Sequence, residues 1–292
     1  MVGPSLKDIA AKYGWPAIGW VLGGPGAGTT KFGAYLRLAS LTQSTRVSAW
    51  GYGDSGLPCG SRVLFGTHIP YGLLFGSLFT DSPPPDVHVV WGSNPAEVQP
   101  LKVMRPIMNA KEKGTLLVVI DPRFTVTASK ADVYLGVKPG TDIALALAIM
   151  NVIFQKNLHD EAFILKHTVG PYLVRIDTGE FLRGKDIGAE EVEAYVVWDS
   201  SSNSPRLRNT ADINPSLTGT FTVNGIACKP SFQLLMDLAQ EYPLQRAADI
   251  SGVSAEMINK LAVHIGKANT VTFVTNLGFT RTYHGDISFR AM

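Results

Sequence analysis

The chain has 292 residues, of which 45% are hydrophobic and 17% are charged, and its formal net charge is +2. This amount of apolar material is enough for a buried core and for one or two domains. The near balance of charge gives no indication of nucleic-acid binding. The two cysteines, Cys59 and Cys228, are too few for a four-cysteine zinc or iron–sulfur site. We expect both to be buried thiols, with a disulfide between them as the alternative.

The sequence lacks a run of the ~20 apolar residues that a membrane-spanning helix needs. Its longest apolar helical run covers residues 143–154. The first twelve residues carry charges and no apolar stretch of the signal-peptide kind, so the choice between a cytoplasmic and a periplasmic location stays open. Because the sequence ends abruptly at residues 289–292, with no C-cap and no polar tail after Asp286, we expect it to be a fragment of a larger protein.

A glycine-rich stretch at residues 23–30 is the first local motif. It resembles a phosphate loop but lacks the Lys-Ser/Thr ending of a Walker motif, so a plain turn explains it equally well. Further along, short and continuously apolar runs predict strands buried on both faces of a parallel sheet. These runs are residues 87–91, 116–120 and 133–137. Residues 98–113 are the predicted crossover helix between the first two strands, with ends blurred by Pro100 and Pro106.

The spacing of apolar residues then predicts two helices and a fourth strand, at residues 142–156, 255–265 and 270–274. Thr141 is the expected N-cap of the first helix, which is apolar almost all round and should pack between layers. Ser254 and Gly266 are the expected N-cap and C′ residue of the second. Residues 195–229 alternate short β-like runs with Asn, Gly and Pro, which predicts an irregular or antiparallel insertion.

Small or polar residues follow each of the first three predicted strands: Gly92, Ser93, Asn94 and Glu97, then Asp121, Arg123 and Thr125, then Gly140, Thr141 and Asp142. Ligands of open α/β sheets bind beyond the carboxyl ends of the strands. Asp121 is placed to accept from ribose hydroxyls, Arg123 to pair with a phosphate, and Asp142 to accept paired N–H donors from a guanine-like edge. Each group alone is explained as a turn or a helix cap, but three at successive strand ends favour one nucleotide site.

These loops resemble those of the molybdopterin oxidoreductase family, also called the dimethyl sulfoxide reductase family. The resembling segments are residues 90–97, 119–128, 131–132 and 138–146, with weaker similarity in 172–183, 198–199, 217–219 and 278–285. The resemblance implies an α/β fold of parallel sheets flanked by helices, with a dinucleotide-binding-like domain inserted in a second α/β domain. Residues 1–50 would begin that second domain, 51–240 would form the insertion, and 241–292 would return to a truncated second domain.

The resemblance also implies a bis(molybdopterin guanine dinucleotide) cofactor that carries molybdenum or tungsten. One dinucleotide would be lined by Gly92, Ser93, Asn94 and Glu97. Its ribose and phosphates would be contacted by Asp121, Arg123 and Thr125, and its guanosine by Gly140, Thr141 and Asp142. The second dinucleotide or the active-site funnel would be faced by Gly278 and Arg281. A 4Fe-4S cluster would belong to a missing N-terminal segment or to a partner iron–sulfur subunit, and a membrane anchor subunit could complete the assembly.

The family supplies one protein ligand to the metal, some tens of residues before the loop at Gly92. In the glycine-rich stretch of residues 51–61, Asp54 takes the ligand place by this resemblance, and Asp54 and Ser55 are our predicted catalytic residues. Ser55, one residue out of register, is second, and the softer thiol of Cys59 is third. The alternative is that Asp54 caps a turn and Cys59 is a small buried hydrophobe.

The function implied by the resemblance is two-electron redox or oxygen-atom transfer on a small substrate. A non-redox hydratase or transhydroxylase of the same family is an alternative. An NAD-type Rossmann dehydrogenase is another, although no GxGxxG motif joins a strand to a helix here. A non-catalytic binding module that kept the fold is the third. Among the histidines, His88 is expected to be a core residue, and His284 is the one near a predicted strand end.

Overall fold

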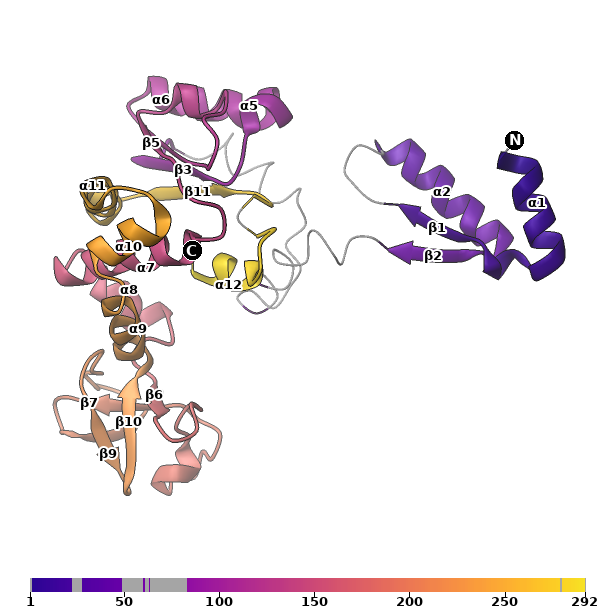
Figure 1. Cartoon of the computed structure of the whole chain (residues 1–292). Helices are drawn as coiled ribbons and strands as arrows, with labels where there is room; N and C mark the ends of the chain where they lie inside the picture. Colours follow the sequence, from indigo (N-terminus) through magenta and orange to yellow (C-terminus); the bar gives the residue numbers. More distant parts are fainter. Residues whose placement is uncertain are drawn as a thin grey trace.

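The computed structural model describes residues 2–22, 28–48, 83–278 and 280–291, together with Gly60 and Val63. Its centre is a four-stranded parallel sheet in the order β11-β3-β4-β5 (Figure 1). The strands are β3 (Val87–Trp91), β4 (Leu116–Ile120), β5 (Val133–Leu135) and β11 (Val271–Thr275). Every residue of β3 is buried, as the continuous apolar run predicted. The predicted α/β fold with a parallel sheet flanked by helices is therefore confirmed.

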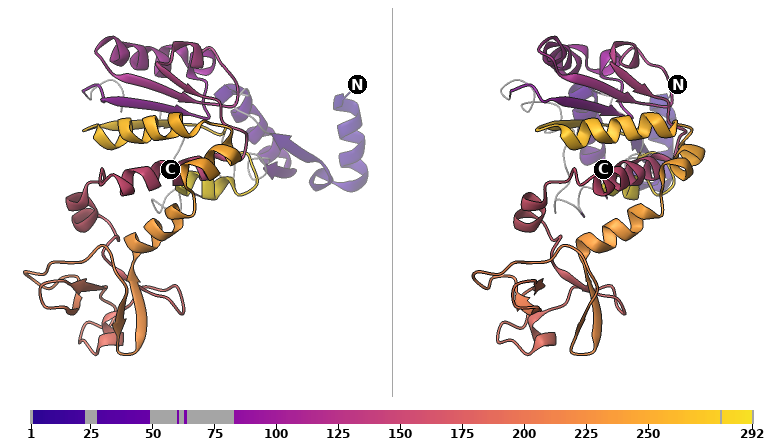
Figure 2. Two further views of the ribbon diagram at one scale, coloured as in Figure 1. Left: turned by 60° about the vertical axis from the view of Figure 1, so that its left-hand side comes forward. Right: turned by 90° about the vertical axis from the view of Figure 1, so that its left-hand side faces the viewer.

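Helices cover both faces of this sheet (Figure 2). One face packs on α7 (Asp142–Gln155), α10 (Leu244–Ser251), α11 (Ala255–Lys267) and α12 (Gly285–Ala291). The other packs on η3 (Pro100–Met104) and α6 (Arg105–Glu112). Alternate residues of β3 divide between the two cores, because successive side chains of a strand point to opposite faces. Val89 and Trp91 belong to the first core, and Val90 belongs to the second.

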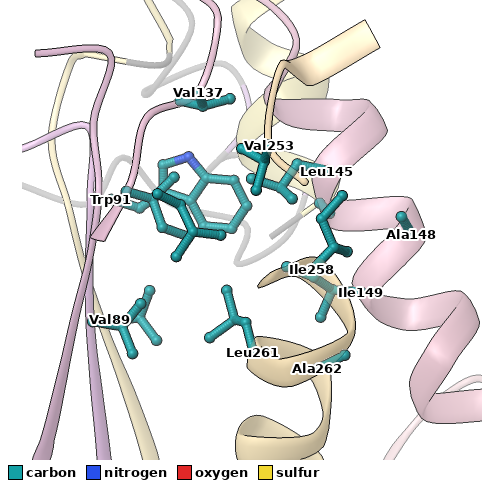
Figure 3. Close-up of a cluster of buried hydrophobic side chains, with 14 of the residues drawn as sticks. Val89, Trp91, Val137, Leu145, Ala148, Ile149, Val253, Ile258, Leu261 and Ala262 are labelled. Atoms are coloured by element: carbon teal, nitrogen blue, oxygen red, sulfur yellow. The ribbon is translucent and has the colours of Figure 1, made fainter. Parts of the chain in front are cut away.

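The larger core is built around Trp91, the last residue of β3 (Figure 3). Its ring reaches from the sheet toward the two helices beside it and lies near Val137, Leu145 and Val253. Trp91 is only 2% exposed, so its orientation is set by close packing and not by solvent. The core thus fixes a large side chain at the carboxyl edge of the sheet.

A separate antiparallel region lies between α8 (Glu161–His167) and α9 (Ser231–Gln240), as predicted for residues 195–229. Its strands are β6 (Leu173–Arg175), β7 (Val196–Asp199), β8 (Ser204–Leu207), β9 (Phe221–Val223) and β10 (Ile226–Pro230), with the short helix η5 (Gly184–Ile187). They form a three-stranded sheet in the order β6-β10-β9 and a hairpin of β7 with β8. Cys228 is buried in the core of this region as a free thiol, and Cys59 lies outside the described residues.

The N-terminal part of the chain has a parallel pair of its own. Strands β1 (Gly19–Leu22) and β2 (Thr45–Ser48) pair with each other and accompany α1 (Val2–Tyr13), η1 (Trp15–Ala17) and α2 (Gly28–Thr42). Figure 1 shows this part to one side of the central sheet. The sheet pairing of β11 with β3 joins residues after 240 to the middle of the chain. The predicted boundaries at residues 50 and 240 stay a prediction.

Several helix ends and caps in the structure differ from those predicted from the sequence. The expected crossover helix is three pieces, α5 (Pro95–Val98), the π-helical η3 and α6, because Pro100 is the first residue of η3 and Pro106 the second residue of α6. Helix α11 continues through Gly266 to Lys267, so Gly266 is not a C′ residue. The Thr141 side chain does not cap α7; its hydroxyl donates to the Lys138 carbonyl instead. Within the described part of the chain, no helix is both long and apolar enough to cross a membrane.

Candidate functional site

A pocket of about 350 Å³ opens at the carboxyl edge of the central sheet. It is lined by Gly92, Ser93, Asn94, Ile120, Asp121, Pro122, Arg123, Thr125, Val137, Pro139, Gly140, Asp142 and Gly278. These residues come from the carboxyl ends of the strands or from the segments that follow all four of them, because parallel strands place their carboxyl ends at one edge. The structure thus brings Asn94, Asp121 and Asp142 to one pocket.

Three predicted cofactor-binding residues lie outside this lining. Glu97 is near the rim, with its Oε2 3.7 Å from the Arg123 guanidinium, and both side chains are largely exposed. Thr141 donates its hydroxyl to Lys138, as described above. The backbone N–H of Arg281 donates to the Leu277 carbonyl at 3.1 Å, in the turn after β11. Three further candidates lie outside the described residues: Asp54, Ser55 and Cys59.

Two glycines allow the loops after β3 and β11 to meet. Gly92 has a φ of +61°, a left-handed conformation that favours glycine, and its N–H donates to Ile120. The carbonyl of Gly92 accepts from the N–H of Gly278 at 3.2 Å. A Cβ atom at position 278 would overlap the backbone of Gly92. The pocket therefore needs glycine at 278 for a close backbone contact that no side chain would allow.

Asn94 has one side-chain end fixed and the other end without a partner. Its Oδ1 accepts from the hydroxyl of Thr127 at 2.7 Å, and that hydroxyl accepts from the Ala96 N–H at 3.0 Å. This hydrogen bond fixes the orientation of the Asn94 side-chain amide, with its oxygen on Thr127 and its nitrogen on the other side. The Nδ2 atom is buried and makes no hydrogen bond to any residue that the structure describes. A buried amide N–H₂ without an acceptor costs free energy, so this atom is suited to a ligand oxygen or nitrogen.

Asp121 is a buried carboxyl directly after β4. Its Oδ1 accepts from the N–H of Arg123 at 2.9 Å. Burial raises the pKa of Asp121, and the Arg123 N–H and guanidinium charge oppose that rise only in part. The carboxyl therefore retains unused capacity to accept hydrogen bonds.

Asp142 is the second buried acid of the pocket, at the start of α7. Trp91 donates its indole N–H to Asp142 Oδ1 at 2.7 Å. Burial raises the pKa of Asp142, while the Trp91 hydrogen bond and the N–H groups of Asp142 and Gly140 lower it. The nearby charge of Asp121 raises it again. Two acids with elevated pKa values in one pocket are typical of a binding or catalytic site.

This arrangement fits the nucleoside end of a nucleotide. The carboxylates of Asp121 and Asp142 can accept from ribose hydroxyls and from the N–H groups of a base. Phosphate oxygens would be repelled by both acids and would lie toward Arg123 on the rim. Among the described residues, no group of three or more His, Cys, Asp and Glu side chains could hold a metal ion.

The two histidines singled out from the sequence lie elsewhere. His88 is buried within β3 and does not line the pocket. Burial lowers the pKa of His88 to about 4. His284 has a φ of +59° and its ring lies against that of Tyr283, also outside the pocket lining. Neither histidine is placed to act on a ligand in this pocket.

Two contributors to the site could not be singled out from the sequence. In the sequence, Trp91 has the pattern of the last apolar residue of a strand. Thr127 has no feature that distinguishes it from Thr125 in the same loop after β4. Their partners Asp142 and Asn94 are far away in the sequence, so no local pattern indicates either hydrogen bond. Only the preference of a buried indole N–H for a polar partner could have pointed to Trp91.

Comparison with known proteins gives a consistent family. The model of the family described as molybdopterin oxidoreductase matches residues 1–292. A protein of Halobacterium salinarum, named as a candidate catalytic chain of dimethyl sulfoxide reductase, is 34% identical over 201 residues, which cover 68% of this chain and 24% of that protein. The alpha chain of perchlorate reductase from Dechloromonas aromatica is 30% identical over 242 residues, covering 70% of this chain and 26% of that protein.

A solved structure agrees at the level of the fold. Acetylene hydratase from Pelobacter acetylenicus superposes with a TM-score of 0.56 at 21% identity, covering 99% of this chain and 30% of that one. The chain spans about a quarter of the length of the curated relatives named above.

Proposed function

The chain belongs to the molybdopterin oxidoreductase family, and on that basis we propose that it forms part of an enzyme for two-electron redox or oxygen-atom transfer on a small substrate. The family match agrees with the resemblance seen in the strand-end loops. The cofactor of the proposal is a bis(molybdopterin guanine dinucleotide) with molybdenum or tungsten, and when bound it supplies the redox chemistry. The role of this chain's pocket is to bind and orient one nucleotide end.

One observation carries the proposal: Asn94, Asp121 and Asp142 line a single pocket and retain hydrogen-bond donors or acceptors for a ligand. The buried Nδ2 of Asn94 is a donor without an acceptor among the described residues. The two acids are acceptors whose pKa values are raised by burial. A guanosine offers both kinds of partner, so a guanine dinucleotide fits this set better than a bare phosphate.

The remaining elements of the proposal concern parts that the described residues do not include. Asp54 is our predicted metal ligand, with Ser55 and Cys59 as the alternatives. We propose that electrons pass through 4Fe-4S clusters on another segment or on a partner iron–sulfur subunit. The Dechloromonas relative is named as the alpha member of its enzyme, which supports an assembly of several subunits. A membrane anchor subunit is part of the same proposal.

Cofactor analysis of the full chain tests the proposed function. Protein produced in cells supplied with molybdate or tungstate should yield a fluorescent pterin after acid oxidation, GMP after hydrolysis, and bound metal. Asn94→Ala should lower the GMP and pterin content about tenfold, because a hydrogen bond at a buried site is lost. Asn209→Ala is the matched control, since the Asn209 side chain lies away from the pocket and donates to Glu191.

Other outcomes would point to other functions. A bound nicotinamide without pterin would establish the Rossmann dehydrogenase alternative. Protein that holds neither metal nor nucleotide would support a non-catalytic binding module. Metal and pterin together with hydration but no redox activity would identify a hydratase.

A further inference from the structure

We propose that Trp91 is a positioning residue that holds the Asp142 carboxylate for the edge of a guanine base and so sets the base preference of the pocket. This inference rests on the proposed function, because it assigns a role within the same nucleotide site. It concerns a residue that belongs to the hydrophobic core and does not line the pocket.

The first support is the fixed position of the donor. Trp91 ends β3 and is 2% exposed, with its ring packed between the sheet and helices α7 and α11 (Figure 3). Close packing leaves such a ring one orientation. Its N–H therefore reaches a fixed point at the carboxyl edge of the sheet, where the acceptor is Asp142 Oδ1 at 2.7 Å.

The second support is the position of the acceptor. Asp142 is 5% exposed and lines the pocket at the start of α7. An ionised carboxylate accepts only, and its two oxygens lie side by side, which matches the adjacent N1–H and N2–H donors of guanine. A hydrogen bond from a rigid indole restricts rotation of the carboxylate. We therefore expect Trp91 to keep the acceptor plane in a productive orientation.

The third support is electrostatic. Burial favours the protonated form of Asp142, and a protonated acid would present a donor where guanine also presents donors. The Trp91 hydrogen bond favours the ionised form. The other charged groups of this pocket are Asp121, which disfavours a second negative charge, and Arg123. Loss of the indole N–H should thus weaken guanine recognition through orientation and through ionisation.

The test compares nucleotides that differ only at the base. The full chain without cofactor is titrated calorimetrically with GDP and with IDP, which lacks the N2 amino group. The unmodified protein should prefer GDP by about tenfold, the discrimination that one lost partner of a paired contact produces. In Trp91→Phe, which keeps an aromatic ring in the core, the preference should fall toward parity.

A structural role for Trp91 predicts a different pattern. Damage to the core would weaken GDP and IDP binding equally and leave their ratio unchanged, which would overturn the proposal. In an Asp142→Asn background, Trp91→Phe should have no further effect on the ratio, because the indole acts through the carboxylate. The pH at which GDP binding is half lost should also be higher in Trp91→Phe than in the unmodified protein.

A measurement without a core substitution covers the case in which Trp91→Phe fails to fold. One indole N–H resonance of the unmodified protein should move in Asp142→Asn and should also move when GDP binds. The proposal would be contradicted if no indole N–H resonance shifted either in Asp142→Asn or on GDP binding. If the unmodified protein binds GDP, IDP and ADP alike or not at all, the proposed function fails at the nucleotide site, a result distinct from failure of the Trp91 role alone.

Discussion

Buried carboxyl groups in the antiparallel region and at the edge of the parallel sheet differ in their hydrogen bonding and in the direction of their pKa shifts. In the antiparallel region, Asp199 accepts from the N–H and hydroxyl of Ser202 and from the N–H groups of Ser201 and Asn214. These bonds, the Ser202 hydroxyl first, lower the pKa of Asp199 to about 2. The carboxylate is fully used by its own chain, so its role is to hold the hairpin together.

At the edge of the parallel sheet, the carboxyl groups of the pocket keep unused capacity to accept hydrogen bonds. Asp121 and Asp142 have raised pKa values because burial outweighs the hydrogen bonds that they receive. Burial alone therefore does not mark a binding residue. What distinguishes the pocket acids is that the protein only partly offsets the cost of their desolvation, which leaves acceptors free for the ligand that we propose.

The largest effect should come from disrupting the backbone contact that shapes the pocket. Gly278→Ala places a Cβ against the Gly92 carbonyl, so the two loops must separate. We expect the free energy of unfolding to fall by about 1–3 kcal/mol and GDP affinity to fall at least tenfold. Chemical denaturation and calorimetry measure the two effects.

Gly33→Ala is the matched control for this substitution. Gly33 lies in helix α2 with open space around it, so alanine should raise stability slightly and leave GDP affinity unchanged. Unchanged GDP binding in Gly278→Ala would show that the pocket does not depend on this contact.

The second effect is a difference in acid stability. His88 has a folded pKa of about 4, below its ordinary 6.5, so the unfolded chain binds a proton in this window and the folded chain does not. As the pH falls from 6.5 to 4, this difference removes stability, up to about 3 kcal/mol. Asp121 and Asp142 act in the opposite direction, because their raised pKa values favour the folded state as the pH falls.

Comparison of variants separates these contributions. The free energy of unfolding of His88→Leu, minus that of the unmodified protein, should grow by about 3 kcal/mol between pH 7 and pH 4. His167→Leu, at an exposed position of α8, is the control. A difference that does not change with pH would show that His88 is not a source of acid sensitivity.

The smallest expected effect comes from comparing a substitution of the pocket acid Asp121 with one of the structural acid Asp199. Asp121→Asn should reduce GDP affinity about tenfold with little change in stability, because it removes the charge from the acceptor that we propose for the nucleotide. Asp199→Asn should lower the thermal midpoint and leave GDP affinity unchanged, because its bonds are to its own hairpin and the loop beside it. If both substitutions affect only stability, the distinction between the two regions is wrong.

Much of the framework could be predicted from sequence because its signals are local. The apolar runs of β3 and β4 predicted their bounds correctly, and Ser254 caps α11 as predicted. The convergence of Asn94, Asp121 and Asp142 followed from the geometry of parallel strands. The contacts of Trp91 and Thr127 could not be predicted, since they join residues that are distant in sequence and depend on packing.

A crystal structure of the full chain with GDP would test the central claim most directly. We predict the guanosine in the pocket at the sheet edge, with the base edge on Asp142, the ribose near Asp121 and the Nδ2 atom of Asn94 bonded to the nucleotide. A second pocket, of about 390 Å³, in the antiparallel region is lined by Arg175, Arg183, Lys185 and Asp186 among others. GDP bound there, with the sheet-edge pocket empty, would contradict the account.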